Sequence, residues 1–599
     1  MTPDPERVPE NLRAGRRALD ALAGVSILSD WHRREGVSGW VLRLRLRADV
    51  DVPGPVPACT NWYVVADASY PWGKVTFCPD RDGGIAGTYP HQMHNSMGDR
   101  RWPWRDGHIC LDTPGQHITR MGGGLPALGD PHARLHDYCV RALEWLSQAS
   151  RGALLSDGDP FELPHFPASG GCHVAFLEDA VSFAGWSSSS RNHGLVRMTR
   201  TEGRSPFLAV REFQDPQGSA IATAPWGLGI EGEEVNGVWI RGSRPPVVPP
   251  WGAPTTWEEL LAAVPELERA LRGALGHLPA TSATLLLVGF PIPERVGDPP
   301  RCMHWQALDL PQPPRLVARG FRNTSEGRWQ YYRSVVTRRS PITWHNTENW
   351  ASGRFSSRGQ LPAALRSRQV LLLGAGAVGA PVGEMLVRGG VVDLVVMDGD
   401  VLSAGNLLRH TLGLAHLHLP KAPSLAETLN QAIPTARVRG MGQAFPPSPD
   451  PASAGVRECT VAIDCTAEDG VLHHMETFQW AGPMIFASLS IGRRARRLYC
   501  YLARADAFPH ARFLELYAPW ASREQQEGQS DDLTWEGTGC WHPVFPAVHS
   551  EILLMASLGV SELASFVEKP WTSERFSVYE QVWRDGYPEG VARIDGSAA

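Results

Sequence analysis

Residues 369–379 read QVLLLGAGAVG, an apolar run that leads directly into the glycines Gly374, Gly376 and Gly379. A continuous apolar run followed by this glycine spacing predicts a buried strand, a tight turn and the start of a helix. The glycines allow the backbone to approach a phosphate closely, and the helix N-terminus offers unpaired N–H groups to it. The stretch therefore predicts a Rossmann-like βαβ unit that binds a nucleotide.

A second apolar run covers residues 391–397 and ends at Asp398, which stands 19 residues after Gly379. An acidic residue at about this distance is typical of one that binds ribose hydroxyls. The glycines and Asp398 alone fit a dehydrogenase that binds NAD or FAD as well as they fit an enzyme that binds ATP. The residues after Asp398 distinguish between these two classes of enzyme.

Polar residues downstream favour ATP. Asp400, Asn406, Arg409 and Lys421 follow the second run, and a further apolar strand ends at Asp464. Hydride transfer requires no such series. Transfer of a nucleotide to a carboxylate does, because cations must offset charge on the α-phosphate and on departing pyrophosphate, while carboxylates hold Mg²⁺. The pattern predicts an enzyme that uses ATP and Mg²⁺ to activate a carboxylate.

Together these segments resemble the ThiF/MoeB and ubiquitin-activating adenylyltransferase family over roughly residues 350–560. The matching pieces are GAGAVG at 374–379, MDGDVL at 397–402, SAGNLLRH at 403–410, Lys421 and IDCT at 463–466. The resemblance implies a nucleotide site made of Gly374, Gly376, Gly379, Asp398, Asp400, Asn406, Arg409, Lys421 and Asp464. In such a site Asp398 binds the ribose, and Arg409 and Lys421 contact phosphates during catalysis. It also implies a homodimer.

The chain departs from the family pattern at the metal site. The family commonly carries a second aspartate three residues after the first, where this chain has Ala467. We therefore expect Asp464 or Asp469 to bind Mg²⁺ in its place. Lys421 has an alternative interpretation as a solvated surface lysine, but it is one of three lysines among 57 basic residues, which favours a function.

A cysteine near the C-terminus has the setting of a nucleophile. Residues 536–545 read EGTGCWHPVF and place Cys540 in a glycine-flanked segment with His542 nearby. This segment resembles the catalytic-cysteine segment of ubiquitin-activating relatives, which implies a thioester on Cys540. The alternative is a thiol that only fills space in a core.

The first 150 residues contain a second candidate thiol. A helical pattern over residues 10–23 precedes four strand-like runs and a long loop that ends in GHICLD at 107–112, and a helical pattern resumes at 131–147. This order and the GxICLD string resemble the ubiquitin-conjugating fold and its active-site cysteine, here Cys110. His108 is a candidate base, and Asn95 a candidate oxyanion donor, although the proline usual in that family is absent beside it. A core thiol is again the alternative.

The expected fold class is a multidomain α/β and α+β protein. We expect an N-terminal ubiquitin-conjugating-like α+β domain over 1–150, a linker over 151–167, an α/β middle scaffold over 168–345, and a Rossmann-like ThiF adenylation domain with the catalytic cysteine segment over 346–599. In the middle domain, Thr256 could cap a helix that extends through Leu271, and residues 283–290 form a buried strand. No nucleophile, phosphate-binding or metal-ligand motif is visible there.

Composition narrows the partners and the compartment. A net charge of −6 gives no global basic field, which argues against nucleic acid and anionic membranes as partners. No run of 18 apolar residues is present, the first ten residues are polar, and the ten cysteines form no CxxC pair. We expect a cytoplasmic protein with reduced thiols.

Two resemblances in one chain imply a relay in which the acyl group passes from an acyl-adenylate to Cys540, then to Cys110, then to an amine, namely an acceptor lysine on a target protein. Such fusions resemble the activating and conjugating proteins of bacterial antiphage CBASS operons, whose substrate is the C-terminal tail of a cGAS-like nucleotidyltransferase. A ubiquitin-like protein from another operon is an alternative substrate. Sulfur-carrier adenylation and a non-catalytic scaffold remain further alternatives.

Overall fold

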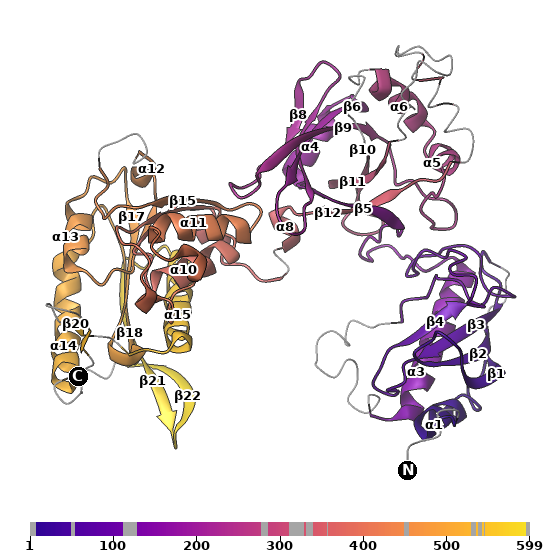
Figure 1. The fold of residues 1–599 in the computed structure, drawn as a ribbon, viewed down its shortest axis with the longest axis horizontal. Helices are drawn as coiled ribbons and strands as arrows, with labels where there is room; N and C mark the ends of the chain where they lie inside the picture. Colours follow the sequence, from indigo (N-terminus) through magenta and orange to yellow (C-terminus); the bar gives the residue numbers. More distant parts are fainter. Residues whose placement is uncertain are drawn as a thin grey trace. The chain divides into compact units, whose positions relative to one another are not determined.

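A computed structural model describes residues 7–49, 54–111, 129–276, 285–310, 340–355, 358–448, 454–528 and 546–594, together with 327, 329, 330, 333, 535, 536, 542 and 543. The chain divides into two compact units (Figure 1). The first comprises Met1–Ala224 and Glu234–Asn349, and the second comprises Pro225–Glu233 and Trp350–Ala599. Each unit is described by itself.

The first unit begins with a helix, a four-stranded antiparallel sheet and a long helix. These elements are α1 (Glu10–Ala18), β1 (Val25–Arg33), β2 (Trp40–Arg47), β3 (Cys59–Ala66), β4 (Val75–Pro79) and α3 (Pro131–Arg151). One face of α3 buries Leu135, Cys139 and Leu146 in the same core as the sheet residues Leu42 and Leu44. The arrangement matches the predicted α+β order of helix, meander and helix.

The first helix is shorter than predicted. The pattern over residues 10–23 continues past Ala18, but there the Leu19 N–H bonds to the carbonyl of Arg16, three residues back, which tightens the last turn. Gly24 then adopts φ +83°, a left-handed conformation that turns the chain into β1. The apolar spacing therefore persists through turns that are not helical.

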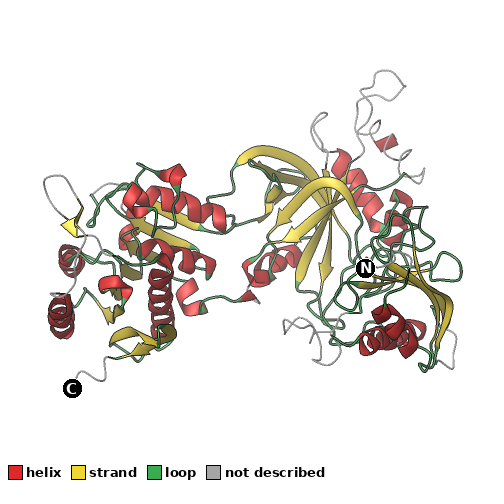
Figure 2. Cartoon of the chain, turned by 60° about the horizontal axis from the view of Figure 1, so that its bottom comes forward, coloured by secondary structure: helices red, strands yellow, loops and turns green. Residues whose placement is uncertain are grey.

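The unit continues with a curved eight-stranded mixed sheet in the order β5-β12-β11-β10-β9-β6-β7-β8 (Figure 2). Its strands are β5 (Ala168–Phe176), β6 (His193–Thr201), β7 (Leu208–Gln214), β8 (Ala220–Thr223), β9 (Gly232–Arg241), β10 (Leu285–Ile292), β11 (Cys302–Asp309) and β12 (Trp344–Asn349). Three helices accompany them: α4 (Ala180–Ser188), α5 (Trp257–Ala263) and α6 (Glu266–Gly276). The predicted buried strand at 283–290 is confirmed as β10, whose residues are almost all buried.

The predicted helix after Thr256 is two helices. Thr256 caps α5 as expected, since its Oγ1 accepts the Glu259 N–H at 3.2 Å while Glu259 accepts the Thr256 N–H at 3.2 Å. The single continuous helix was wrong, because Pro265 has no N–H to donate and its ring disfavours helical backbone in Val264. Both helices still bury their leucines in one core.

The second unit contains the Rossmann-like sheet, in the order β15-β14-β13-β16-β17-β18-β21-β22. Its strands are β13 (Val370–Leu373), β14 (Asp393–Met397), β15 (Arg437–Met441), β16 (Val461–Asp464), β17 (Met484–Ile491), β18 (Arg497–Ala505), β21 (Glu574–Arg584) and β22 (Tyr587–Arg593). The first five are parallel, and β18, β21 and β22 continue antiparallel. Strand order reverses between β13 and β16, and ligands bind beyond the carboxyl ends of strands at such a point.

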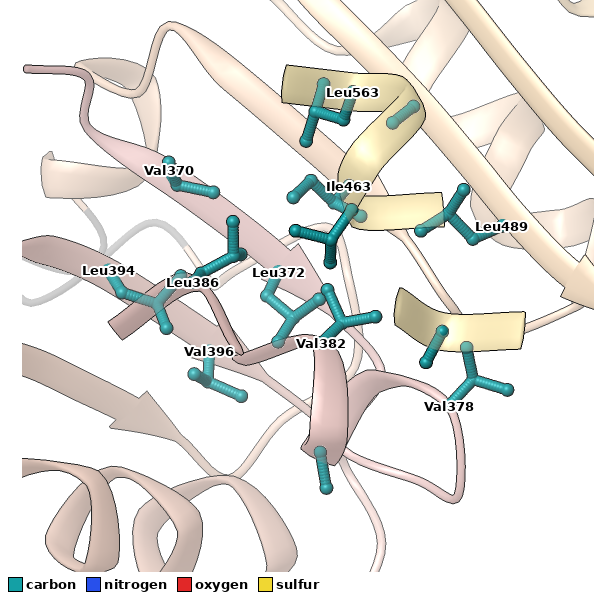
Figure 3. Packing of buried hydrophobic residues seen from close by; sticks show 14 of the residues in the cluster. Val370, Leu372, Val378, Val382, Leu386, Leu394, Val396, Ile463, Leu489 and Leu563 are labelled. Atoms are coloured by element: carbon teal, nitrogen blue, oxygen red, sulfur yellow. The ribbon is translucent and has the colours of Figure 1, made fainter. Parts of the chain in front are cut away.

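Helices cover both faces of this sheet. They include α10 (Gly379–Arg388), α11 (Lys421–Ala432), α13 (Asp469–Thr477), α14 (His510–Gly528) and α15 (His549–Val567), with short helices α8 (Ser352–Phe355), α9 (Ala363–Arg366) and α12 (Ala454–Arg457) and the two-residue strands β19 (Trp535–Glu536) and β20 (His542–Pro543). Alternate residues of β13 point to opposite faces. Val370 and Leu372 pack with Val382 and Leu386 of α10 (Figure 3), whereas Leu371 and Leu373 pack on the face of α13 and α14.

One helix in the described part of the chain, α15, is long and apolar enough to cross a membrane by length and composition, with a mean hydropathy of 1.4 over its 18-residue window. Half of that window is buried within the protein. Its side chains Ile552, Met555 and Leu563 belong to the core cluster that also contains β13 and α10. Serines and glutamates interrupt the apolar residues, which is why no continuous apolar run is visible in the sequence.

A short segment of the chain, residues 225–233, belongs to the second unit and is called the strap below. Residues 225–233 follow β8, include the first two residues of β9 and group with the C-terminal half of the chain. The Gly227 N–H donates to the Pro434 carbonyl at 2.8 Å, and the Leu228 N–H donates to the Ala436 carbonyl at 2.9 Å. The indole of Trp226 lies edge-on to that of Trp350 at 6.2 Å between ring centroids. Nothing in the sequence pattern predicts this strap.

A buried arginine joins α14 to the antiparallel strands. Arg497 is fully buried, and its guanidinium bonds to Glu524 at 2.9 Å, to Glu527 at 2.8 Å and to Glu580 at 2.7 Å. The hydrogen bonds from Arg497 lower the pKa of Glu527 from 4.5 to about 2. Because the folded pKa lies below the unfolded one, this stabilisation is complete above pH 4.5 and is lost as the pH falls toward 2.

Replacing Arg497 with alanine should lower the free energy of unfolding of the second unit by about 3–5 kcal/mol, because it leaves a cluster of carboxylates without their counter-charge. The adjacent Arg496, which contacts Glu527 and Glu580 but is 56% exposed, is the matched control, and R496A should cost about 0–1 kcal/mol. Urea denaturation measures both. Equal losses in the two variants would contradict the assignment.

Candidate adenylation and thioester sites

The glycine turn lies at the switch point of the sheet, between the carboxyl ends of β13 and β16. Gly374 has φ +87°, and its N–H donates to the Met397 carbonyl at 2.8 Å. A Cβ on residue 379 would lie 1.9 Å from the Gly374 carbonyl oxygen, whereas a Cβ on Gly376 would meet no atom within 4 Å. Gly374 and Gly379 therefore shape the turn, and the open space beside Gly376 fits the close approach of a phosphate.

Asp398 follows β14 and fixes the same turn. One carboxylate oxygen accepts the Ala375 N–H at 2.7 Å, and the other accepts the Asp400 N–H at 2.7 Å. An ionised carboxylate has about four acceptor positions, so both oxygens can still accept hydroxyl groups. The position fits the predicted ribose contact.

Lys421 is the first residue of α11 and is buried, with 7% of its surface exposed. Its ammonium lies 2.8 Å from Asp400 Oδ2, and its backbone N–H donates to the Asp400 carbonyl at 2.9 Å. The alternative of a solvated surface lysine is therefore wrong. A buried ammonium at a helix N-terminus beside the glycine turn would attract a polyphosphate strongly.

Asn406 and Arg409 belong to one compact turn. The Asn406 side-chain oxygen accepts both the backbone N–H and the hydroxyl of Ser403, each at 3.0 Å. The Arg409 N–H donates to the Asn406 carbonyl at 3.0 Å, and the arginine side chain is half-buried. Asn406 thus shapes the turn that presents Arg409, in addition to any contact with phosphate.

His410 is a residue that the sequence analysis missed. It is buried, its Nε2–H donates to the Ala375 carbonyl at 2.5 Å, and its Nδ1 accepts the Leu412 N–H at 3.0 Å. Burial lowers the pKa of His410, so the neutral imidazole is held in one tautomer. His410 ties the glycine turn to the turn that carries Arg409. Its place directly after Arg409 was the only available signal.

The two predicted metal ligands differ in their surroundings. Asp464 is 1% exposed, and its oxygens accept hydrogen bonds from the Thr466 hydroxyl at 2.6 Å and the Ser488 hydroxyl at 2.9 Å. Burial raises the pKa of Asp464. Asp469 is exposed at the first turn of α13. Ala467, between them, has φ +57°, a left-handed conformation that aspartate tolerates better than alanine.

Cys110 is exposed in a loop beside β4, which excludes the alternative of a core thiol. Its N–H donates to the His91 carbonyl at 2.8 Å, and the neighbouring Ile109 N–H donates to the Phe77 carbonyl at 3.2 Å. With His108, it lines a cavity of about 790 Å³. Burial, followed by the nearby charge of Lys74, lowers the pKa of His108 and favours a neutral imidazole.

The predicted oxyanion role of Asn95 does not fit its surroundings. Asn95 is 4% exposed, and its amide group donates to the carbonyls of Ile85 at 3.0 Å and Gly87 at 2.9 Å. Its side-chain oxygen accepts from Arg105 at 3.0 Å. Both amide hydrogens are therefore used to hold the loop before Cys110.

The second predicted thiol, Cys540, lies outside the described residues. The two-residue strands on either side of it pair antiparallel, Trp535 opposite Pro543 and Glu536 opposite His542. The assignment of Cys540 as a nucleophile stays a prediction.

Two family models match the chain. The model of the Cap2 central linker domain matches residues 152–350, and the model of the ThiF family matches residues 349–471. The second range contains the glycine turn, Asp398, Arg409, Lys421 and Asp464. The fold and the site thus define an adenylating enzyme of the ThiF class, joined to a ubiquitin-conjugating-like domain.

A curated relative extends this result to nearly the whole chain. The ATP-dependent ubiquitin transferase-like protein Cap2 of Enterobacter hormaechei subsp. hoffmannii (strain UCI 50) is 32% identical over 573 residues, which cover 92% of this chain and 94% of the relative. The chain belongs to this ubiquitin transferase-like family.

Other similarities are confined to part of the chain. The adenylyltransferase and sulfurtransferase UBA4 of Yarrowia lipolytica (strain CLIB 122 / E 150) is 33% identical over 94 residues, 16% of this chain and 23% of the relative. Among solved structures, E. coli MccB with AMPCPP and selenomethionine MccA has a TM-score of 0.26 at 11% identity, and covers 38% of this chain and 64% of that chain. MccB with ATP has a TM-score of 0.27 at 12% identity, with 44% and 70% covered.

Replacing His410 with alanine should weaken ATP binding about tenfold, because the buried Ala375 carbonyl loses its donor and the two turns are no longer joined. Calorimetric titration of ATP at pH 7.5 measures the change. The exposed His418 is the control, and H418A should bind ATP as the unaltered protein does. Unchanged affinity in H410A would contradict the positioning role.

Proposed function

We propose that this chain uses ATP to activate the C-terminal carboxylate of a protein and transfers the resulting acyl group through Cys540 and Cys110 to an amine. The observation that carries the proposal is the buried ammonium of Lys421, which pairs with the exposed carboxylate of Asp400. Hydride transfer at a dinucleotide site does not require a buried ammonium at that position. A site that transfers a nucleotide does, because negative charge develops on the leaving pyrophosphate.

The first step forms one bond and breaks one. A carboxylate oxygen attacks the α-phosphorus of ATP, the bond to the bridging oxygen of the β-phosphate breaks, and pyrophosphate leaves. Arg409 and Lys421 offset the charge on the α-phosphate and on pyrophosphate, and Asp398 holds the ribose. The glycine turn presents backbone N–H groups that need no rearrangement during the reaction.

Mg²⁺ would supply further charge neutralisation on the phosphates. The donors available at the carboxyl end of β16 fit it unequally. The exposed Asp469 can offer a carboxylate without loss, whereas Asp464 would have to give up hydrogen bonds from Thr466 and Ser488. Asp469 is therefore the preferred ligand of the two, with Asp464 positioning the turn.

The second stage is a thioester relay. The Cys540 thiolate attacks the acyl carbon and AMP leaves; the Cys110 thiolate then takes the acyl group in exchange for the Cys540 thiol. An amine attacks the Cys110 thioester, forms an amide and releases the thiol. The exposed position of Cys110 supports its part in this exchange. The conjugating-like domain is the part of the chain that would accept the activated acyl group and transfer it to an amine.

The relative's name supports an ATP-dependent ubiquitin transferase-like activity. We propose a cytoplasmic homodimer that acts in antiphage defence and joins the C-terminal tail of a cGAS-like nucleotidyltransferase to target lysines. A ubiquitin-like protein is the alternative substrate. The sulfur-carrier function has weaker support, since UBA4 matches 16% of the chain and the sequence has no CxxC pair.

Substitution of Lys421 with alanine should reduce ATP–pyrophosphate exchange about a hundredfold in the presence of the cognate carboxylate protein, because a charge on the leaving group is no longer offset. Lys569 is the matched control, since it is exposed, and K569A should retain full exchange. Exchange measured with labelled pyrophosphate gives both values. Full exchange in K421A would refute the proposed role.

Two cysteine variants test the order of the relay. On non-reducing gels, C110A should retain a thiol-sensitive adduct at Cys540, whereas C540A should form none at all, because Cys110 receives the acyl group from Cys540. Cys59 is exposed and provides the control, and C59A should form both adducts. A thiol-sensitive adduct on C540A would show that the order is wrong.

A further inference from the structure

The cavity at Cys110 has two walls from different parts of the first unit. One wall comes from the conjugating-like domain and includes His91, His108 and Cys110. The other comes from residues 152–350, the range that matches the model of the Cap2 central linker domain and is called the middle domain below, and includes His165, His304 and Asn346. The cavity volume is about 790 Å³, which is enough to hold a lysine side chain.

The middle domain also holds the loop that carries the thiol. Both oxygens of Glu162 lie 3.0 Å from the His91 backbone nitrogen, which donates to them, and Oε2 lies 2.8 Å from the His91 imidazole. His91 has φ +57°, a left-handed conformation that costs free energy in a residue with a side chain. Its carbonyl in turn accepts the Cys110 N–H at 2.8 Å. Glu162 is therefore linked to Cys110 through one residue.

The wall from the middle domain is a connected polar surface. Gln306 accepts from the Thr347 hydroxyl at 2.9 Å and donates to the His345 carbonyl at 2.7 Å, and the His345 imidazole lies 2.8 Å from Asp309. His304, Gln306 and His345 are all buried. Buried polar groups are costly unless they are satisfied, and here they are fixed to one another along β11 and β12.

We propose that the middle domain forms the acceptor side of the Cys110 thioester site: its wall receives the lysine side chain of the target, and Glu162 positions the cysteine loop through His91. The proposal rests on the proposed function of Cys110. In the step itself a C–N bond forms, the thioester C–S bond breaks and the sulfur leaves as a thiolate. The proton lost by the amine passes to a neutral imidazole of His108 or His165. Burial lowers the pKa of both.

The test charges Cys110 of the full-length protein directly, with a synthetic peptide thioester that ends in glycine, so that neither ATP nor the natural substrate is needed. Charged protein is separated from the reagent, and discharge is followed by mass spectrometry with L-lysine or hydroxylamine as the acceptor. Hydroxylamine is small and does not need a cavity that fits a side chain. C110A shows which adduct belongs to Cys110.

Asn346 is exposed and lines the cavity from the middle domain, so N346W should fill the cavity without a cost in folding. In N346W, discharge onto L-lysine should slow about tenfold, because the lysine side chain no longer fits in the cavity. Discharge onto hydroxylamine, which is small, should stay within about twofold of the rate of the unaltered protein. Glu348, exposed on the same strand and outside the cavity lining, is the matched control as E348W.

Glu162 gives a second, independent variant. E162A should slow discharge onto L-lysine about tenfold, because it removes every contact from Glu162 to residue 91. H91A removes only the imidazole contact and should slow discharge less, and the double variant should be no slower than E162A. Unchanged lysine discharge in charged N346W and E162A would overturn the acceptor wall. Failure of the unaltered protein to be charged at Cys110 would instead overturn the proposed function, and the proposal with it.

Discussion

No side chain can stand at residue 379, because a Cβ there would lie 1.9 Å from the Gly374 carbonyl oxygen. This close approach holds the start of α10 against the end of β13, and the adenylation site depends on it. The turn is then fixed from three further sides, by the Met397 carbonyl, the Asp398 carboxylate and the His410 imidazole. The first two come from the end of β14, and His410 comes from the turn that carries Arg409. The nucleotide site is thus a single rigid turn that several elements hold in place.

Paired charged or basic side chains shape both candidate sites. In a chain with three lysines, the buried one pairs with a carboxylate that is itself largely exposed, so Asp400 neutralises Lys421 at little desolvation cost of its own. At the other site the pairing of His91 with Glu162 serves geometry, because it holds a left-handed residue next to Cys110. In both sites a carboxylate pairs with a basic side chain from another segment close to the group that does the chemistry.

Local sequence patterns predicted much of the fold and of the nucleotide site. The run before Gly374, the strand ending at Asp398 and the order of the conjugating-like domain are all readable because apolar periodicity and glycine spacing are local properties. Pro265 was also readable and was overlooked. His410 and Glu162 could not have been found in this way, since a buried histidine and a clamp 71 residues from its partner have no local signature. The domain boundaries and the part played by Cys540 remain predictions.

The strap at 225–233 affects how the molecule can be divided. The polypeptide passes between the two units at 224–225, at 233–234 and again at 349–350. Cleavage at the last junction would therefore separate two chains, and the strap of the N-terminal chain would remain bound to the adenylation unit only through non-covalent contacts. A fragment that begins at Trp350 would lack the donors that now satisfy the carbonyls of Pro434 and Ala436. It would also lose the edge-on contact between the rings of Trp226 and Trp350. A protein made for separate study of the adenylation unit should therefore include residues 225–233 fused to it.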